Sequence, residues 1–292
     1  MQRPRLAASS RMRFTRSPFG NAVNLFFLLL LSLLMAIPMV YTVSSAFKPM
    51  DELFLFPPRL WVSNPTLANF WNLSGIMRDS WIPMSRYLMN SLLLTAIGVT
   101  GQVVFASMAA FVLSRETFHG KAFLNKVVML SLMFSGSVTA VPNYFIMSRL
   151  GMINTHLSIL LPAFCSSLGL FLMKQFMDQM IPYTVVEAAR IDGAGEWTVY
   201  SRVVMPMCRP AWFTLIIFSF QSLWSNTGGT YIYDEQLKTL PYALNNIVSG
   251  GTIARTGVSA AVALLLIIPP LITFIISQSN VLETMATSGL KD

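Results

Sequence analysis

One polar stretch at positions 187–210, EAARIDGAGEWTVYSRVVMPMCRP, interrupts an otherwise strongly apolar chain. It places acids, arginines and two glycines between two long hydrophobic runs. Carboxylates and guanidinium groups at this density can pair with charges on another protein surface, and the small side chains of Ala188 and Ala189 would let that surface approach closely. The stretch is therefore either a docking element or an ordinary solvated loop, and its residues alone slightly favour the loop.

The residue types that usually carry catalysis or bind metals are scarce and scattered. The sequence has no GxxxxGKS/T phosphate loop and no HExxH zinc motif. His119 and His156 are far apart, and so are Cys165 and Cys208, which we expect to be unpaired thiols. We therefore expect a chain that is not an enzyme, holds no metal and binds no cofactor.

The composition places these residues in a membrane protein. Of 292 residues, 54% are hydrophobic and only 11% are charged, with a mean hydropathy of +0.60, whereas a soluble domain averages about 25% charged residues. A membrane-spanning helix needs about 20 mostly apolar residues, so the chain has room for about six spans. Because an open sheet cannot satisfy its backbone in lipid, we expect an all-α membrane protein.

Six apolar runs predict six transmembrane helices. The first follows an arginine-rich head and is long enough to be a retained span rather than a cleaved signal peptide. Within the second run, Gly98 and Gly101 are expected to permit close helix packing. The six predicted spans cover residues 22–41, 88–113, 127–147, 157–176, 211–225 and 258–276.

The basic residues predict how the chain is oriented. Six spans place both termini on one side of the membrane, and lysine and arginine concentrate in the head, the 115–126 loop and the 174–210 loop on that side. Cytoplasmic loops carry such an excess, so we expect cytoplasmic N- and C-termini and a cytoplasmic polar stretch. The net charge of +8 then reflects topology, and we expect no nucleic-acid partner.

The polar stretch is predicted to fold as a helix, a glycine break and a second helix. Thr184 and Glu187 have the spacing of a capping box, in which the Thr hydroxyl caps an amide and the Glu reaches back. Pro182 could instead stand in the first turn of a helix that begins slightly earlier. In either case Gly193 ends the first helix. The two predicted helices cover residues 185–192 and 196–205.

This pattern resembles the EAA loop of type I ABC importer permeases, the membrane subunits of ATP-driven importers. In that loop E-A-A, two further residues, D-G-A and a hydrophobic helix closing with P-x-x-x-P recur. One departure is Gly195, which stands where many relatives have a Ser or Thr that caps the second helix. The matching positions are Glu187, Ala188, Ala189, Asp192, Gly193, Ala194, Pro206 and Pro210.

The resemblance extends over most of the chain. The segments at 44–58 and 64–73 resemble the region that follows the first span in the sugar-importing branch of this family, and those at 89–95 and 141–162 resemble later parts of it. The tail, TSGLKD, resembles the end of that branch but closes with Asp292 where glycine is usual. The likeness is strongest to the G-type permease subunit of maltose-type oligosaccharide importers.

The resemblance implies a six-helix, MetI-like type I importer domain at 22–292, preceded by a basic cytoplasmic segment at 1–21 and carrying a coupling loop at 177–210. The implied location is the bacterial cytoplasmic membrane, and the implied function is the import of sugars, with oligosaccharides favoured. The implied partners are a second homologous permease, two cytoplasmic ATPase subunits that bind ATP and Mg²⁺, an extracytoplasmic solute-binding protein, membrane lipid and the sugar itself. The sequence does not specify which sugar.

The resemblance assigns the polar stretch to contact with an ATPase subunit. Glu187 and Arg190 would make polar contacts, and the small residues would let the backbone approach. Asp192 would brace the glycine turn, or serve only as a local turn stabiliser. The implied coupling residues are Glu187, Ala188, Ala189, Arg190, Asp192, Gly193 and Ala194.

Polar residues inside the predicted spans are candidates for the solute path, because they are costly in lipid and usually face a cavity or a partner. In the fifth span, Phe218, Gln221 and Ser225 recur at helical spacing, with Trp224 beside them. Helix packing or interfacial anchoring would explain the same residues. The candidates are Asn90, Asn143, Phe218, Gln221, Trp224 and Ser225.

The outer loop at 228–252 is a second candidate contact surface. In the maltose-type subunit the corresponding loop reaches into the binding protein, so the resemblance implies a similar contact here, and a plain outer lid is the alternative. The candidate contact residues are Tyr231, Tyr233, Asp234 and Glu235.

Two other functions stay open. The same class of transporter could carry another small solute, such as an amino acid or a polyol. A self-sufficient secondary transporter would instead require ionisable residues buried in the spans or inverted repeats, and the predicted spans contain almost no charge.

Overall fold

The computed structural model describes residues 18–78, 81–249 and 256–288, and in these ranges the chain forms helices joined by loops, with no strand. The expected all-α fold is thus confirmed for this part of the chain. Most of the basic segment at 1–21 lies outside the described residues, as do residues 79–80 of the first outer loop, residues 250–255 at the end of the second outer loop, and the last four residues of the tail.

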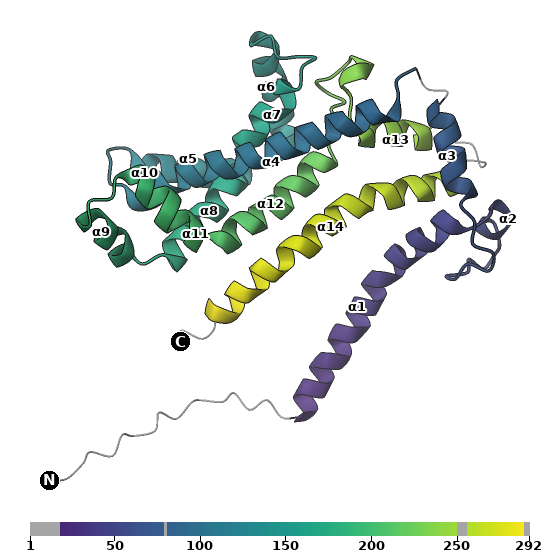
Figure 1. Cartoon of the computed structure of the whole chain (residues 1–292), viewed down its shortest axis with the longest axis horizontal. Coiled ribbons are helices and arrows are strands. Elements are labelled where there is room, and N and C mark those ends of the chain that lie inside the picture. The colour runs from purple at the N-terminus through teal and green to yellow at the C-terminus, as the bar shows by residue number, and fades with distance from the viewer. Residues whose placement is uncertain (1–17, 79–80, 250–255, 289–292) are drawn as a thin grey trace.

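Helix α4 (Met84–Arg115) is the central element and runs the length of the bundle (Figure 1). Its 32 residues correspond to about 48 Å at ~1.5 Å per residue. It packs against α7 (Leu157–Phe164), α8 (Ser167–Met180) and α12 (Arg209–Trp224). Because these neighbours surround it, α4 is the most buried of the candidate membrane spans in the described residues.

Two glycines of α4 make this close packing possible. A Cβ atom on Gly98 would overlap the side chain of Leu223 in α12, and a Cβ atom on Gly101 would overlap the ring of Phe164 in α7. The expected role of both glycines in helix contact is therefore confirmed, because the neighbouring side chains occupy the space that a larger residue would need.

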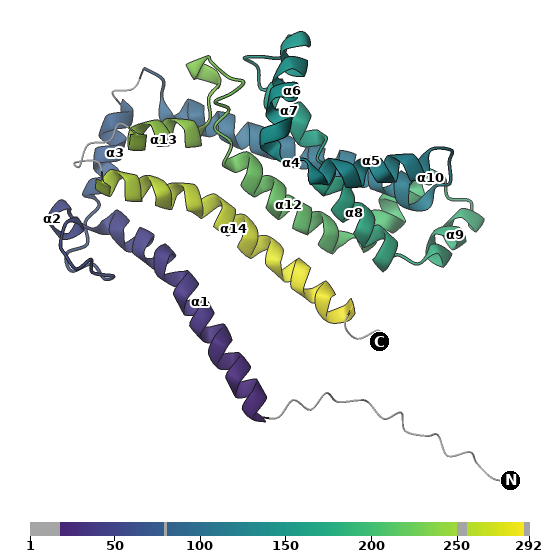
Figure 2. The same cartoon turned by 180° about the vertical axis from the view of Figure 1, so that it is seen from behind.

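The first and last spans are α1 (Pro18–Phe47) and α14 (Thr256–Ser288), and they contact one another. They converge beside α3 (Ala68–Arg78) and separate toward their other ends (Figures 1 and 2). Every side chain from 21 to 40 in α1 is exposed. Because this stretch is almost wholly apolar, it suits contact with lipid or with another membrane helix.

The third predicted span, 127–147, is not one helix. It is divided between α5 (Lys121–Met133) and α6 (Gly136–Arg149), which are bent by 112° relative to one another. Phe134 and Ser135, at the break, both adopt extended backbone. Serine and glycine are weaker helix formers than the apolar residues around them, and the Ser-Gly pair at this point accounts for the break. The expectation of one continuous helix was wrong.

The fourth and fifth spans are also composite. Between α7 and α8 the helix is interrupted at Cys165 and Ser166. The fifth span, α12, follows α10 (Glu196–Thr198), the π-helical segment η1 (Val199–Val204) and α11 (Met205–Met207), with a bend of 78° between α11 and α12. The described residues contain four candidate spans, or up to six when each bent pair is counted as one span.

Short helices gather at the two ends of α4 (Figures 1 and 2). Helices α2 (Met50–Leu53), α3 and α13 (Leu240–Ser249) lie at one end, together with the 3₁₀ helix η2 (Glu235–Leu237). Helix α9 (Tyr183–Ile191) and α10 lie at the other end. We refer to these as the α3 end and the α9 end of α4.

Candidate coupling surface and solute pathway

The polar stretch opens with α9, whose start differs from the prediction. Pro182 is the N-cap residue, with φ −62° and ψ 141°, and no side chain caps the helix. Thr184 therefore lies inside the first turn, and the predicted capping box of Thr184 with Glu187 was wrong. The helix does begin earlier, as the alternative expected, but Pro182 is the residue before its first turn and does not lie within that turn.

The predicted glycine break and second helix are confirmed. Gly193 follows α9 with φ +83°, a left-handed conformation that carries little penalty for a residue without a Cβ atom. Gly195 then acts as the N-cap of α10, with φ −68° and ψ 157°. The helix continues through η1 and α11, and Pro206 lies in its last turn.

Two of the small residues face inward. Ala189 and Ala194 pack against the core cluster that contains Val186 and Val199. The amide of Ala194 also donates a hydrogen bond to the carbonyl of Ala189 at 3.0 Å. These alanines therefore hold the turn against the bundle, since larger side chains would push α9 away from the core.

The outer surface of this loop combines charge with exposed apolar area. Glu187, Ala188 and Asp192 are exposed, and so are two large side chains that sequence reasoning missed, Ile191 (85% exposed) and Trp197 (66% exposed). Both were visible in the sequence as bulky apolar residues next to the D-G turn. The Asp192 carboxylate accepts no hydrogen bond from the described residues, so the expected bracing of the turn is not seen.

Arg190 is engaged within the chain. Its guanidinium forms ion pairs with Glu116, which follows α4, and with Glu196 of α10, the latter with Nε 2.8 Å from Oε1. The hydrogen bond with Glu196, opposed by partial burial and helped by the charge of Glu116, raises the pKa of Arg190. Arg190 therefore ties α9 to α10 and to the end of α4, a role that the sequence did not indicate.

The last residues of α4 contact the chain where α8 leads into α9. Arg115 is buried, and its Nη2 donates to the carbonyls of Met177 and Ile181, the latter at 2.6 Å. Its guanidinium lies 4.4 Å from the ring centroid of Tyr183, and the Tyr183 hydroxyl donates to the carbonyl of Ser114 at 3.1 Å. These contacts fix the direction in which α9 leaves α8.

The α3 end of α4 holds the outer loop in a similar way. Asn90 is buried, and its Nδ2 donates to the carbonyls of Gln236 at 2.8 Å and Lys238 at 2.9 Å. Ser91 Oγ accepts from the amide of Leu240 at 2.8 Å. Asn90 was predicted as a solute-path residue, and the role seen in the structure is this anchoring of the loop.

The predicted binding-protein contacts lie on this anchored loop. The ring of Tyr231 stacks on Tyr144 of α6 with centroids 6.3 Å apart, and the hydroxyl of Tyr233 is 3.0 Å from that of Tyr144. The Oδ1 atom of Asn154 accepts from the amides of Tyr233 and Asp234. The loop is thus packed onto α6 and the α6–α7 connection, and Tyr233, Asp234 and Glu235 are its exposed candidates.

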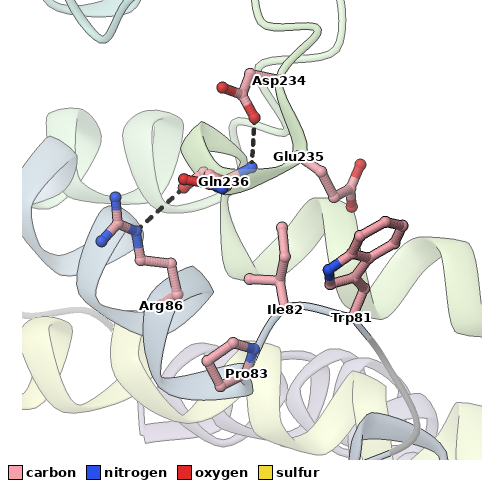
Figure 3. A pocket seen from close by; sticks show the side chains of 7 residues that line it. All are labelled: Trp81, Ile82, Pro83, Arg86, Asp234, Glu235 and Gln236. Atoms are coloured by element: carbon pink, nitrogen blue, oxygen red, sulfur yellow. Dashed lines mark hydrogen bonds between the residues drawn. The ribbon is translucent and has the colours of Figure 1, made fainter.

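An open groove of about 500 Å³ lies beside these residues (Figure 3). Arg86 donates from Nε to the carbonyl of Gln236, and the Asp234 carboxylate accepts from the Gln236 amide at 2.9 Å. Glu235 accepts from the hydroxyl of Tyr87 at 2.8 Å. The groove walls are Trp81, Ile82, Pro83, Arg86, Asp234, Glu235 and Gln236.

The solute-path candidates of α12 are divided between two cavities. Gln221 and Ser225 line a groove of about 440 Å³ between α12 and α14, together with Pro270 and Phe274. Phe218 lines a different cavity, of about 260 Å³, between α12, α4 and the α7–α8 break. The structure thus brings Gln221 and Ser225 together but separates them from Phe218. Helical spacing alone could not reveal this, because α12 has neighbours on two sides.

The two remaining candidates have different surroundings. Trp224 is buried, stacks on Phe220 with centroids 5.9 Å apart, and donates from Nε1 to the carbonyl of Leu266 at 3.1 Å. It therefore serves helix packing between α12 and α14, the alternative that the sequence left open. Asn143 is half-buried in α6 and joins neither of these two cavities.

Comparisons with known proteins agree with this architecture. No protein-family model matches the sequence. The diacetylchitobiose uptake system permease protein NgcG of Streptomyces coelicolor is 31% identical over 223 residues, covering 76% of this chain and 70% of that protein. A solved bacterial ABC transporter involved in the import of the acidic polysaccharide alginate superposes with a TM-score of 0.75 at 19% identity, covering 89% of this chain and 96% of that chain.

A second solved structure is that of the alginate transporter in complex with a periplasmic protein bound to alginate pentasaccharide. It superposes with a TM-score of 0.56 at 15% identity, over 88% of this chain and 93% of that chain. Both structural likenesses support the fold, while the sequence identity to NgcG over most of both chains supports common descent. With its candidate spans and its helix–glycine–helix loop, the chain therefore belongs to the ABC importer permease family.

Proposed function

We propose that this chain is one permease subunit of an ATP-driven, binding-protein-dependent sugar importer in the bacterial cytoplasmic membrane, with oligosaccharides as its cargo. The relative NgcG is a permease of a diacetylchitobiose uptake system, and the alginate transporter imports a polysaccharide. Common membership of the permease family supports sugar import here. Another small solute in the same class of transporter is the alternative cargo.

The α9–α10 loop is the proposed site where ATPase motion enters the membrane domain. The observation that carries this assignment is the exposed surface of Glu187, Ala188, Ile191 and Trp197. Exposed apolar side chains rimmed by charge are typical of protein contact sites. ATP and Mg²⁺ would be bound by two separate ATPase subunits, because this chain lacks a phosphate-loop sequence.

The orientation follows from the proposed coupling role. The α9 end of α4 would face the cytoplasm, with both termini on the same side, and basic residues in the flanking loops support this direction. The α3 end would then face the solute-binding protein, with Tyr231, Tyr233, Asp234 and Glu235 as candidate contacts. A second homologous permease would complete the path, and the exposed apolar faces of α5 and α6 suit such a partner or lipid.

The coupling assignment is tested by Ile191→Asp in the complete transporter. Ile191 is 85% exposed, so the substitution leaves the core intact. If the side chain docks into an ATPase subunit, a buried carboxylate there weakens the contact by about tenfold or more. We expect fewer ATPase subunits to co-purify and sugar-stimulated ATP hydrolysis to fall.

The matched control is Thr117→Asp, which adds the same charge to an exposed position in the neighbouring α4–α5 loop. It should leave co-purification and hydrolysis close to those of the parent protein. Normal assembly and stimulated hydrolysis in the Ile191→Asp complex would exclude this surface as the ATPase contact.

A further inference from the structure

The cavity of about 260 Å³ between α4, the α7–α8 break and α12 has an unusual lining for a membrane span. Its polar lining residues come from three segments, and one aromatic ring, Phe218, joins them. No charged residue lines it. The polar residues are Gln102 of α4, Ser166 at the break, and Ser219 and Ser222 of α12.

Gln102 contributes an amide group to the lining of this cavity. The residue is only 8% exposed, and it forms no hydrogen bond with any residue in the described part of the chain. In a membrane protein the lipid offers no replacement partner for a buried amide. The two donors and the acceptor of the amide are therefore available to a molecule that enters the cavity.

The serines extend this pattern. Ser219 Oγ is fully buried and has no hydrogen-bond partner among the residues that the structure describes. Ser166 Oγ accepts from the amide of Gly169 at 3.1 Å, which caps α8 and leaves the hydroxyl proton of Ser166 free for another acceptor. Two hydroxyls and one amide thus stand around the same space.

Gly169 lets the polar groups pack close to the backbone of α8. A Cβ atom there would lie 3.0 Å from Leu215 Cδ1, 3.2 Å from Gln102 Nε2 and 3.4 Å from Ser166 Oγ. A larger residue would therefore displace these side chains and change the lining of the cavity.

We propose that this cavity is a subsite for a neutral saccharide on the solute path, with Gln102 as its main polar contact. Hydroxyl and amide groups both donate and accept, which matches sugar hydroxyls, and Phe218, which is 49% exposed, offers an apolar face. A sugar that carries a carboxylate or phosphate would lose its hydration on entering this cavity and would meet no positively charged side chain there, which costs much free energy. The inference rests on the proposed function and narrows its cargo to uncharged sugars.

The size of the cavity limits what it holds. Small-molecule sites usually measure about 300–1,000 Å³, and this one is slightly smaller. It would therefore hold part of an oligosaccharide at a time. The subsite also places the path on the α4 side of α12, away from the groove of Gln221 and Ser225.

Cysteine protection tests this placement in the complete transporter, with partner permease, ATPases and binding protein. Ser222→Cys and Ser225→Cys are a matched pair, because Ser222 in the last turn of α12 and Ser225 directly after it are both exposed and line different cavities. Cys165 is replaced by serine, and Cys208 is fully buried. The rate at which N-ethylmaleimide alkylates the introduced cysteine is measured under three conditions. These are a mixture of neutral disaccharides (diacetylchitobiose, arabinobiose and maltose), the acidic disaccharide digalacturonate, and no sugar.

We expect the neutral mixture to slow alkylation at Ser222→Cys by about fivefold when its concentration is several times Kd. Digalacturonate should not slow alkylation of the cysteine in Ser222→Cys. The cysteine in Ser225→Cys should be alkylated at the same rate with the neutral mixture, with digalacturonate and without sugar. Protection by digalacturonate, protection at Ser225→Cys alone, or protection at neither position would overturn the proposal. The proposed function fails separately, if no saccharide of either kind stimulates ATP hydrolysis by the parent complex.

A second pair of variants tests the role of Gln102. Gln102→Leu should reduce uptake of the transported sugar by about tenfold, equivalent to one lost hydrogen bond to the solute. Co-purification of the partner permease and the ATPase subunits should be retained, because Gln102 forms no hydrogen bond with the described residues whose loss could disturb assembly. Gln221→Leu, on the other side of α12, should leave uptake unchanged. The opposite result for the two variants, or normal uptake in Gln102→Leu, would overturn the proposal.

Discussion

Arg190 of α9 forms an ion pair with Glu116, the residue that follows α4, although 74 positions separate them in the sequence. Near the other end of α4, the side chain of Asn90 donates hydrogen bonds to the carbonyls of Gln236 and Lys238, which are 146 and 148 positions away in the sequence. One helix therefore carries both segments that are proposed to contact partners. Movement of α9 or of the outer loop relative to α4 would therefore have to break an ion pair or hydrogen bonds with residues at the ends of α4.

Removal of the Glu116 charge should loosen α9. Glu116→Gln eliminates one of the two ion pairs of Arg190 and leaves the pair with Glu196. Both side chains of the lost pair are about one-third exposed, so the free energy of unfolding should fall by no more than about 1 kcal/mol. Hydrogen exchange of the amides in α9 should nevertheless accelerate. Lys174→Gln is the control, since it removes an ion pair within α8. Equal exchange in Glu116→Gln and the parent would contradict the tether.

Asn90→Leu should release the outer loop. The carbonyl of Lys238 loses its side-chain donor and that of Gln236 keeps only Arg86. Two hydrogen bonds at about 1 kcal/mol each predict a loss of ~2 kcal/mol in the free energy of unfolding. Thermal unfolding and protease cleavage between residues 234 and 240 measure the effect.

The control for this variant is Asn143→Leu, because Asn143 forms no hydrogen bond with the described residues. Its effect should stay within about 0.5 kcal/mol. A loss of stability as large as that of Asn90→Leu would show that loop anchoring is not the reason for the effect at Asn90.

Two glycine-to-alanine substitutions should have opposite effects. In Gly101→Ala the new methyl group overlaps Phe164, and such overpacking costs about 1–3 kcal/mol. In Gly75→Ala, in α3, nothing lies within 4 Å of the new methyl group, and the better helix propensity of alanine should add up to about 1 kcal/mol. Thermal unfolding of both variants gives the comparison. Adding Phe164→Leu should restore part of the loss in Gly101→Ala, and a Gly101→Ala protein as stable as the parent would disprove the close contact.

The glycines of the polar loop should also differ from one another. Gly193→Ala places a Cβ atom at φ +83°, which costs about 1–2 kcal/mol. Gly195 has the extended backbone of an N-cap, so Gly195→Ser should gain a few tenths of a kcal/mol through a capping hydrogen bond. Denaturant unfolding of the two variants compares them directly, and stabilisation by both substitutions would contradict the assigned turn.

Much of the fold was predictable because its signals are local. Apolar runs located the membrane helices α1, α4, α12 and α14, since the cost of placing polar groups in lipid acts on each segment separately. The glycine break at Gly193 followed from the conformational freedom of a single residue. The break at Ser135 and Gly136 was also local, but its two-residue signal was weaker than the long apolar run around it.

The candidate sites were predictable only in part. The residue types in the polar loop indicated a contact surface, yet they did not show that Arg190 is turned toward Glu116 or that Ile191 is exposed. Asn90 was predicted to line the solute path, and the partner of its side chain in the structure is the outer loop. In each case the missing information was the position of a segment distant in the sequence.

Hydropathy and backbone preference are properties of short segments, so the sequence was enough to predict an all-α membrane protein with a polar helix–glycine–helix loop. It did not show that α4 joins that loop to the outer loop, or that Gln221 and Phe218 line separate cavities. Those relationships depend on which helices pack on each face of α4 and α12. Helix packing is set by the shapes of side chains that meet across long sequence separations, such as Gly98 with Leu223.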